Sequence, residues 1–228
     1  GRIYDKFRYR LVFPIKNVRG EVVGLSARTL EKDGIPKYLN TSETLVYKKS
    51  DILYGLYEGK DEVRKRNFVI IAEGNVEPLS SRKSDIPNIV VPMGTALTEN
   101  QIKMLKRYTD NIYFAFDTDS AGFKALIRSV EIAYRFDFDI RAINLGKFKD
   151  PDEMITENPT LWKNAVEDAV DIIDFLINYF KSKFDINSAI GKKNFIKNIQ
   201  PFIAHVMDPV EKEHYIKKVS SITNTSQE

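Results

Sequence analysis

Short apolar runs alternate with helix-like stretches through the middle of the sequence, from about residue 67 to residue 154. The runs cover residues 68–72, 89–91, 112–116 and 140–145, and their length is typical of buried strands. Thr98 and Gln101 have the spacing of a capping box in front of an amphipathic stretch, and a second helix is expected from about Ala121 to Phe136. Strands that alternate with helices in this way predict a parallel sheet covered by helices.

The two flanking regions have different patterns. Residues 11–15 and 22–25 predict the strands of a hairpin around a turn at residues 17–20. From Leu161 onward, apolar residues such as Val166, Ile173 and Phe180 recur at helical spacing, so we expect a helical bundle there and no further strand. The predicted fold class is α/β: a parallel sheet with flanking helices, preceded by a small mixed α/β region with a β-hairpin and followed by a C-terminal helical bundle. We divide the chain into regions 1–66, 67–156 and 157–228, and regard the first and the third as truncated.

Composition limits the class of protein further. With 228 residues, 43% of them hydrophobic, the chain can bury a core. Its longest apolar runs are about five residues, far below the roughly 20 that a membrane helix needs, so no membrane partner is expected. The chain has no cysteine, which excludes disulfides, a thiolate nucleophile and Cys-ligated zinc. It begins without Met and without an apolar signal segment, so we expect a fragment of a longer protein from a reducing cytoplasm.

Positive charge is concentrated at the N-terminus. The net charge is only +3, but residues 1–67 hold 15 Lys and Arg against 9 Asp and Glu, whereas the rest of the chain is slightly acidic. Clustered cations attract polyanions such as nucleic acids, although a solvated basic surface without a partner is equally compatible with this count.

Acidic residues follow three of the predicted strands. Glu73 comes directly after the run 68–72, Asp117 and Asp119 come after 112–116, and Asp150 and Asp152 follow the run 140–145 after a short loop. Because ligands of a parallel sheet bind at the carboxyl ends of its strands, we expect these five carboxylates to meet at one edge. Such a set repels itself unless cations neutralise it, and oxygen ligands without His or Cys favour Mg²⁺ or Mn²⁺. We expect more than one ion and no zinc.

Each of these residues also has a simpler interpretation. An Asp after a strand is commonly a helix cap, and Asp150 in front of Pro151 is a good candidate for one. The segment from Asp117 to Gly122 begins like a calcium-binding loop, but Arg128 stands where that loop requires a bidentate Glu, so this alternative is excluded. The metal hypothesis depends on the coincidence of acidic residues at three strand ends.

The acidic residues and their spacing resemble a known family. Glu73-Gly74, followed about 40 residues later by Asp117-x-Asp119-x-x-Gly122, resembles the Toprim domain, a Rossmann-like parallel sheet shared by bacterial primases, topoisomerases and some nucleases. The segments 12–15, 24–28, 36–40, 53–56, 93–98 and 208–211 are similar to the catalytic core of bacterial DNA primases. The resemblance covers nearly the whole chain, in order.

This resemblance implies an activity and a set of residues. The implied activity is that of a DNA-dependent RNA polymerase that synthesises short RNA primers on single-stranded DNA by metal-dependent nucleotidyl transfer. Glu73, Asp117 and Asp119 would be catalytic, and the same three residues with Asp150 and Asp152 would bind the metal ions. The residues implied to contact nucleotide or DNA are Arg28, Lys37, Asn40, Lys49, Gly94 and Thr95.

One stretch departs from the family pattern. Primases usually carry Asp at the position of Glu77, followed by an apolar helix. Here Asn75, Pro78 and two serines weaken that helix pattern. Two alternatives therefore stay open: another Toprim phosphodiester enzyme, either a topoisomerase or a nuclease, and a non-catalytic nucleic-acid-binding relative.

The resemblance also implies partners and a location. The implied ligands are the single-stranded DNA template, ribonucleoside triphosphates and the hybrid of RNA primer and DNA. A replicative helicase and a single-strand binding protein would be contacted through domains outside these residues. The location would be the bacterial cytoplasm, at the replication fork.

Overall fold

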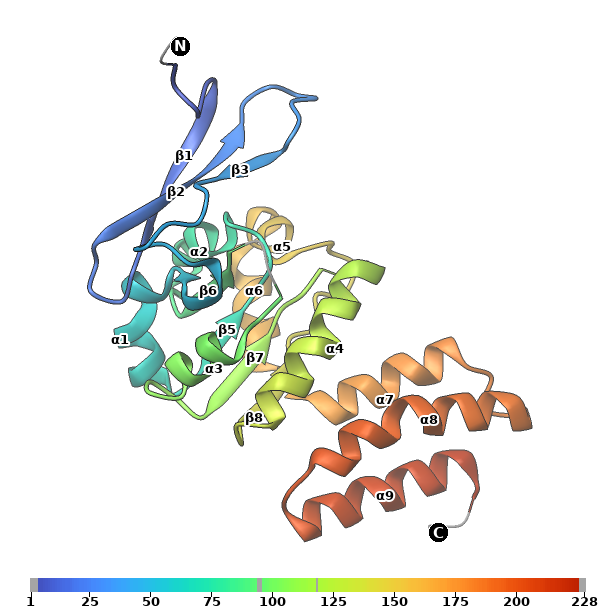
Figure 1. Ribbon diagram of the computed structural model, residues 1–228. Coiled ribbons are helices and arrows are strands. Elements are labelled where there is room, and N and C mark those ends of the chain that lie inside the picture. Colours follow the sequence, from blue (N-terminus) through green and yellow to red (C-terminus); the bar gives the residue numbers. More distant parts are fainter. Residues whose placement is uncertain (1–3, 94–95, 118, 226–228) are drawn as a thin grey trace.

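The computed structural model describes residues 4–93, 96–117 and 119–225, which form two sheets and a set of helices (Figure 1). The small sheet consists of β1 (Arg10–Lys16), β2 (Val22–Thr29) and β3 (Tyr38–Asn40). All its pairs are antiparallel, in the order β1-β2-β3. The predicted hairpin is thereby confirmed, and its turn is closed by the N–H of Gly20, which donates to the carbonyl of Asn17.

The large sheet has six strands in the order β4-β6-β5-β7-β8-β9. Its strands are β4 (Leu53–Tyr54), β5 (Val69–Ile71), β6 (Ile89–Pro92), β7 (Asn111–Phe114), β8 (Asp139–Ala142) and β9 (Val170–Asp171). The four central strands, β6, β5, β7 and β8, pair in parallel, and only the edge strands are antiparallel. The four predicted runs are thus the four parallel strands.

The described residues form nine α-helices and two short 3-10 turns. The helices are α1 (Leu56–Arg66), α2 (Glu77–Ser80), α3 (Glu99–Leu105), α4 (Ser120–Tyr134), α5 (Pro151–Glu157), α6 (Pro159–Glu167), α7 (Ile172–Lys183), α8 (Ala189–His205) and α9 (Pro209–Thr223), and the 3-10 turns are η1 (Lys49–Asp51) and η2 (Ser81–Ser84). The predicted capping box is present at the start of α3, where Thr98 and Gln101 bond each other's backbone N–H groups. None of these helices is long and apolar enough to cross a membrane.

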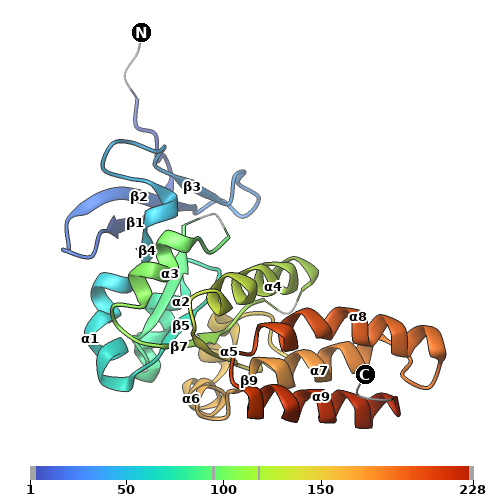
Figure 2. The ribbon, with the colours of Figure 1, turned by 60° about the horizontal axis from the view of Figure 1, so that its bottom comes forward.

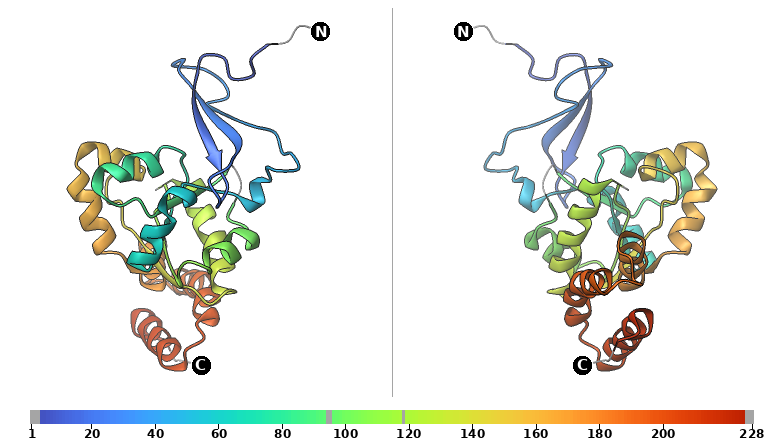
Figure 3. Two further views of the ribbon diagram at one scale, coloured as in Figure 1. Left: turned by 90° about the vertical axis from the view of Figure 1, so that its left-hand side faces the viewer. Right: turned by 90° about the vertical axis from the view of Figure 1, so that its right-hand side faces the viewer.

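The core lies on both faces of the large sheet. Val69 and Ile71 of β5 belong to a core that includes residues of α1, α3, α4 and α7, whereas Ile70 belongs to a second core with residues of α5 and α6. Residues on both sides of the strand are buried, which explains why the parallel strands are continuous apolar runs rather than alternating ones. The small sheet lies beyond one end of the large sheet, and the helical bundle lies at the opposite end of the molecule (Figure 3).

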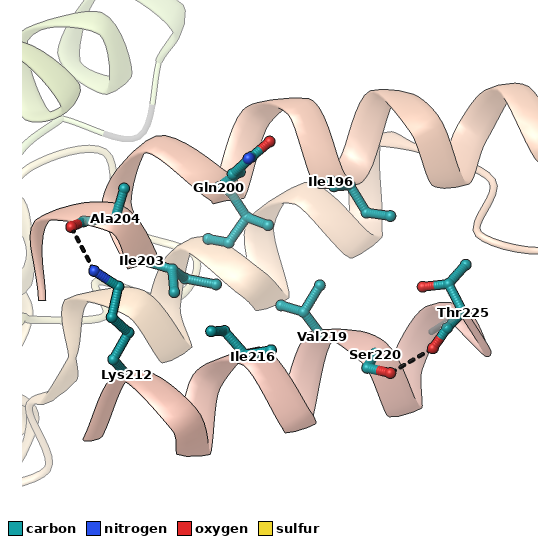
Figure 4. A pocket seen from close by; sticks show the side chains of 10 residues that line it. Ile196, Gln200, Ile203, Ala204, Lys212, Ile216, Val219, Ser220 and Thr225 are labelled. Carbon is teal, nitrogen blue, oxygen red and sulfur yellow. Dashed lines mark hydrogen bonds between the residues drawn. The ribbon is translucent and has the colours of Figure 1, made fainter. Parts of the chain in front are cut away.

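Helices α7, α8 and α9 lie side by side and form the predicted bundle (Figure 2). Between α8 and α9 is a cavity of about 400 Å³, lined mainly by apolar side chains such as Ile203, Ile216 and Val219 (Figure 4). Lys212 closes one end by donating from Nζ to the carbonyl of Ala204 at 3.0 Å. The cavity is remote from the acidic residues.

The expectation that no strand follows Leu161 was wrong. Val170 and Asp171 form β9, which pairs antiparallel with β8. Two residues are too few to show an alternating pattern, and their apolar neighbours fit the helical period of α7. With β4 at the other edge, the sheet extends beyond the predicted region 67–156 on both sides.

Candidate functional site

Six carboxylates gather around the carboxyl ends of the parallel strands, and we call them the acidic edge: Glu73, Glu77, Asp117, Asp119, Asp150 and Asp152. Glu73 lies two residues beyond the end of β5 and Asp117 three beyond β7, and these two strands are parallel neighbours. The N–H of Asp117 donates to Oε1 of Glu73 at 3.3 Å. The parallel pairing therefore brings together residues that are 44 positions apart in the sequence.

Three of the aspartates bond the protein through one carboxylate oxygen each. Oδ1 of Asp119 accepts from the N–H groups of Ala121 and Gly122 at the start of α4, both at 2.8 Å. Oδ1 of Asp150 accepts from the N–H of Glu153 at the start of α5, also at 2.8 Å. Oδ1 of Asp152 accepts a hydrogen bond from the hydroxyl of Ser80. The helix-cap interpretation is thus correct for Asp119 and Asp150, and it leaves the second oxygen of each carboxylate outside these bonds.

Glu77 is the most buried member of the acidic edge. Its side chain is only 4% exposed, and its Oε2 has no hydrogen-bond partner within the residues that the structure describes. Burial, and then the charges of Asp150, Asp117 and Asp152, raise its pKa to about 7. A buried carboxylate oxygen without a partner is costly, which indicates that a cation or another donor belongs beside it.

Glu73 also ionises near neutral pH. Partial burial of its carboxylate and the neighbouring charge of Asp117 raise its pKa to about 7. The pKa of Asp117 is raised as well, first by burial and then by Asp150, whereas Lys149 and Lys37 act in the opposite direction. By contrast, the two backbone bonds of the α4 cap lower the pKa of Asp119. The edge thus holds one readily ionised carboxylate, that of Asp119, and three that are protonated more easily, those of Glu73, Glu77 and Asp117.

In residues 4–93, 96–117 and 119–225 no three of these groups stand close enough to form a ready-made metal cage. The donor set nevertheless fits a hard divalent cation, because it consists of carboxylate oxygens alone and includes the unpartnered oxygen of Glu77. Mg²⁺ in particular usually takes one or two protein carboxylates and keeps waters or substrate phosphates as its other ligands. The metal ligands named from the sequence stay predictions.

The predicted basic residues are distributed unevenly around this edge. Lys37, directly before β3, is near enough to Asp117 to lower its pKa, and Arg28 lies across from Tyr38 in the β2–β3 pair. Tyr38 in turn senses the charges of Glu77 and Asp152. Asn40 ends β3 and Lys49 begins η1, and the structure shows no hydrogen bond or ion pair from either described side chain to the acidic edge. Gly94 and Thr95 lie outside the described residues.

One buried hydrogen bond joins the small sheet to the strand end that carries Glu73. Nδ2 of Asn75 donates to Oγ of Ser26 on β2 at 2.8 Å, and both side chains are buried. Asn75 is part of the stretch that departs from the family pattern. In this structure the hydrogen bond of Asn75 connects the small sheet to the acidic edge.

Three residues of the site were not among those selected from the sequence. Glu77 was noticed only as a departure, Lys149 was not considered although it precedes Asp150, and Ser80 was seen only as a weak helix former. The position of Glu77 four residues after Glu73 was an available signal for a carboxylate on the same edge. The pairing of Ser80 with Asp152 spans 72 positions and has no local signal.

The fold and the acidic edge define the class: a Toprim-like domain between a basic sheet and a helical bundle. Three family models match in order: "DNA primase catalytic core, N-terminal domain" on residues 1–60, "Toprim-like" on 70–155, and "DnaB-helicase binding domain of primase" on 173–228. The DNA primase of Clostridium acetobutylicum is 39% identical over 223 residues, covering 97% of this chain and 37% of that protein. That of Neisseria meningitidis is 35% identical over 217 residues, covering 92% and 36%.

Solved structures give the same result. The E. coli primase catalytic core matches with a TM-score of 0.82 and 29% identity, covering 99% of this chain and 73% of that chain. The zinc-binding and RNA polymerase domains of Aquifex aeolicus primase match with a TM-score of 0.81 and 28% identity, covering 98% and 54%. A DnaG primase catalytic domain bound to single-stranded DNA matches with a TM-score of 0.82 and 29% identity, covering 97% and 71%.

This chain belongs to the bacterial DNA primase family, and its predicted fold class is confirmed. It spans little more than a third of the length of the curated relatives named above. The expectation that the helicase-binding part lies wholly outside these residues was wrong, because residues 173–228 match a family model of that description.

Proposed function

We propose that this chain is the catalytic part of a DNA primase, which joins ribonucleoside triphosphates into short RNA primers on a single-stranded DNA template. The observation that carries the proposal is the acidic edge, with Lys37 and Lys149 near enough to Asp117 to lower its pKa. Carboxylates that bind cations, next to lysines that bind phosphates, are what transfer of a nucleotide from its triphosphate requires. The match to a primase domain solved with single-stranded DNA supports the same substrate class.

The side chains of the edge have distinct roles in this reaction. Lys37 and Lys149 bind the triphosphate of the incoming nucleotide and neutralise the charge that develops on the departing pyrophosphate. The 3′ oxygen of the growing strand attacks the α-phosphorus, and the bond to pyrophosphate breaks. Glu73, whose pKa is about 7, accepts the proton of that 3′ hydroxyl.

Divalent metal ions complete the site. Asp117 and the free oxygens of Asp119, Asp150 and Asp152 would hold them, with Glu77 beside them. Such an ion, Mg²⁺ or Mn²⁺, lowers the pKa of the attacking hydroxyl and stabilises phosphate charge when it is bound. Ser80 and the two helix starts orient the carboxylates, as supporting hydrogen bonds do in metal sites generally.

The test is template-directed incorporation of labelled ribonucleotides by the whole protein, with Mg²⁺ or Mn²⁺. Asp117→Asn removes one charge and no helix cap, and we expect it to reduce the rate by about 100-fold or more. Glu157→Gln, which neutralises an exposed carboxylate at the end of α5, is the matched control and should leave the rate unchanged. An unchanged rate for Asp117→Asn would show the mechanism to be wrong, and cleavage of DNA without nucleotides would favour a nuclease or topoisomerase instead.

We further propose that residues 173–228 contact a DnaB-type replicative helicase. The family match supports this partner, and Met207, between α8 and α9, and Val210, in the first turn of α9, are 80% and 77% exposed. Replacing both with Ser should weaken binding to the helicase in an anisotropy titration. Ile190→Ser, at the other end of α8 and 75% exposed, is the control. Contact with a single-strand binding protein stays a prediction.

A further inference from the structure

A second cavity has Glu73 in its lining. It measures about 460 Å³ and lies between the ends of β5 and β6, the residues before α3, and α4. We call it the α4 cleft, and its lining includes Glu73, Leu97, Phe116, Ala121, Lys124 and Arg128. Its remaining walls are largely small or apolar, among them Ala72, Ala96 and Ala125, so a sugar or a base can approach closely.

Lys124 and Arg128 give this cleft a positive wall. They are four residues apart on α4 and therefore lie on the same face of the helix, and both are exposed. Within the residues that the structure describes, neither forms an ion pair with a carboxylate, whereas Arg135 at the end of the same helix pairs with Glu99 at 2.8 Å. Two cations of this kind facing a cavity are a binding site for phosphate groups.

The two groups of cations are near different members of the acidic edge. Lys37 and Lys149 act on Asp117, which also senses Asp150. Lys124 and Arg128 share a cavity with Glu73 but not with Asp117, Asp150 or Asp152. Glu73 is thus the one member of the edge that lines the α4 cleft.

The proposed reaction needs two separate positions of this kind. Nucleotidyl transfer is an in-line displacement, in which the attacking oxygen and the leaving pyrophosphate lie on opposite sides of the α-phosphorus. Asp117, Asp150 and Asp152, which would hold the metal ions and with them the triphosphate, do not line the α4 cleft. The strand that carries the 3′ hydroxyl therefore takes the cleft.

We infer that the α4 cleft binds the 3′-terminal nucleotide of the growing RNA strand, with Lys124 and Arg128 on its backbone phosphates. The incoming triphosphate then lies on the far side, at Lys37 and Lys149. This assignment rests on the proposed function and adds to it the direction in which the strand leaves the site.

The experiment separates primer binding from nucleotide binding. The whole protein is given a preformed RNA primer annealed to a DNA template, and the KM values for primer–template and for nucleotide are measured separately. In the double variant Lys124→Gln with Arg128→Gln, the KM for primer–template should rise about tenfold or more, while the KM for nucleotide stays within about twofold of wild type. The slope of log affinity against log salt should fall by roughly 1.4 to 1.8, as expected for two lost phosphate contacts.

A matched control is available on α3 and the turn that follows it. Lys103 and Arg107 are also a lysine and an arginine four residues apart, both are exposed, and neither lines the α4 cleft. Lys103→Gln with Arg107→Gln removes the same charge and should change neither KM. An equal rise in the KM for primer–template in both double variants would show a general electrostatic effect and overturn the inference. A rise in the KM for nucleotide alone would place the triphosphate in the cleft, which also overturns it.

Failure of the proposed function would appear differently. In that case the wild-type protein would make no RNA with either metal. Binding measured by anisotropy would still test the cleft, because loss of Lys124 and Arg128 should weaken binding of primer–template more than binding of single-stranded template alone. Equal weakening of both would refute the cleft assignment independently of synthesis.

Discussion

Glu77→Gln tests whether a charged carboxylate is really buried in the acidic edge. The folded protein raises the pKa of Glu77 from its ordinary 4.5 to about 7, chiefly by burial. At 1.36 kcal/mol per pKa unit, ionising this group in the folded state instead of the unfolded state costs about 3 kcal/mol. The substitution keeps the shape of the side chain and removes the titrating group.

The direction of the pH effect follows from proton binding. Between pH 4.5 and about 7 the folded protein retains a proton on Glu77 that the unfolded chain has lost, so wild-type stability falls as pH rises. In the Glu77→Gln variant no proton titrates at this position, so the variant does not lose stability in this way as pH rises. We expect the difference in free energy of unfolding, variant minus wild type, to be constant below about pH 4.5, to rise by about 1.4 kcal/mol per pH unit, and to level off above about pH 7.

Urea unfolding of both proteins without divalent metal, at pH values from 4 to 8, measures this difference. A buried amide that lacks a partner adds a cost of about 1–3 kcal/mol, but this cost is the same at every pH and moves only the baseline. The reasoning would be refuted by a difference that does not change with pH, because Glu77 would then ionise in the folded state as easily as in the unfolded one.

Three further substitutions test other parts of the site. Ser80→Ala removes the hydroxyl that bonds Asp152. The metal concentration for half-maximal RNA synthesis should then rise about tenfold. Ser84→Ala, which removes another buried hydroxyl nearby, should leave that concentration unchanged. Gly122→Ala places a Cβ against the carbonyl of Asp117 and 2.8 Å from Glu73 Oε1, so we expect the rate of RNA synthesis to fall by about 100-fold. Gly146 has a φ of 60° and open space around it. Gly146→Ala should therefore cost about 1 kcal/mol of stability in urea unfolding and leave the rate unchanged. Asn75→Ala breaks the buried bond to Ser26 and should cost about 1–2 kcal/mol in urea unfolding; if the same loss occurs when Ser26 is already Ala, the bond is not its cause.

Most of the fold could be predicted because its strands are buried on both faces. Such strands must be apolar throughout, and that requirement made β5, β6, β7 and β8 visible as runs. The start of α3 was predictable for a different reason, since the bonds of its capping box involve residues only three positions apart. The edge strands β4 and β9 were harder to see, because each has two residues and depends on pairing with a distant strand.

The site was predictable only as far as strand ends determine it. Glu73 and Asp117 come together because parallel neighbours end at the same edge, which the run pattern implies. The burial of Glu77 and the bond between Ser80 and Asp152 depend on how α2 packs against α5, and no local pattern encodes that packing. Likewise, the sequence showed the basic surplus of the first 67 residues, but not that Lys37, unlike Lys49, is near enough to Asp117 to lower its pKa.

In the proposed reaction Asp119 and Asp150 each have two roles, and this affects how any substitution there can be interpreted. Replacement with Ala removes a carboxylate from the acidic edge and also the cap of α4 or α5, which is worth about 1 kcal/mol. A fall in activity would then have two causes that no activity measurement alone can separate. Serine keeps the cap and lacks the charge, so the Ser variants isolate the chemistry, and the gap between Ser and Ala reports what the helix start contributes.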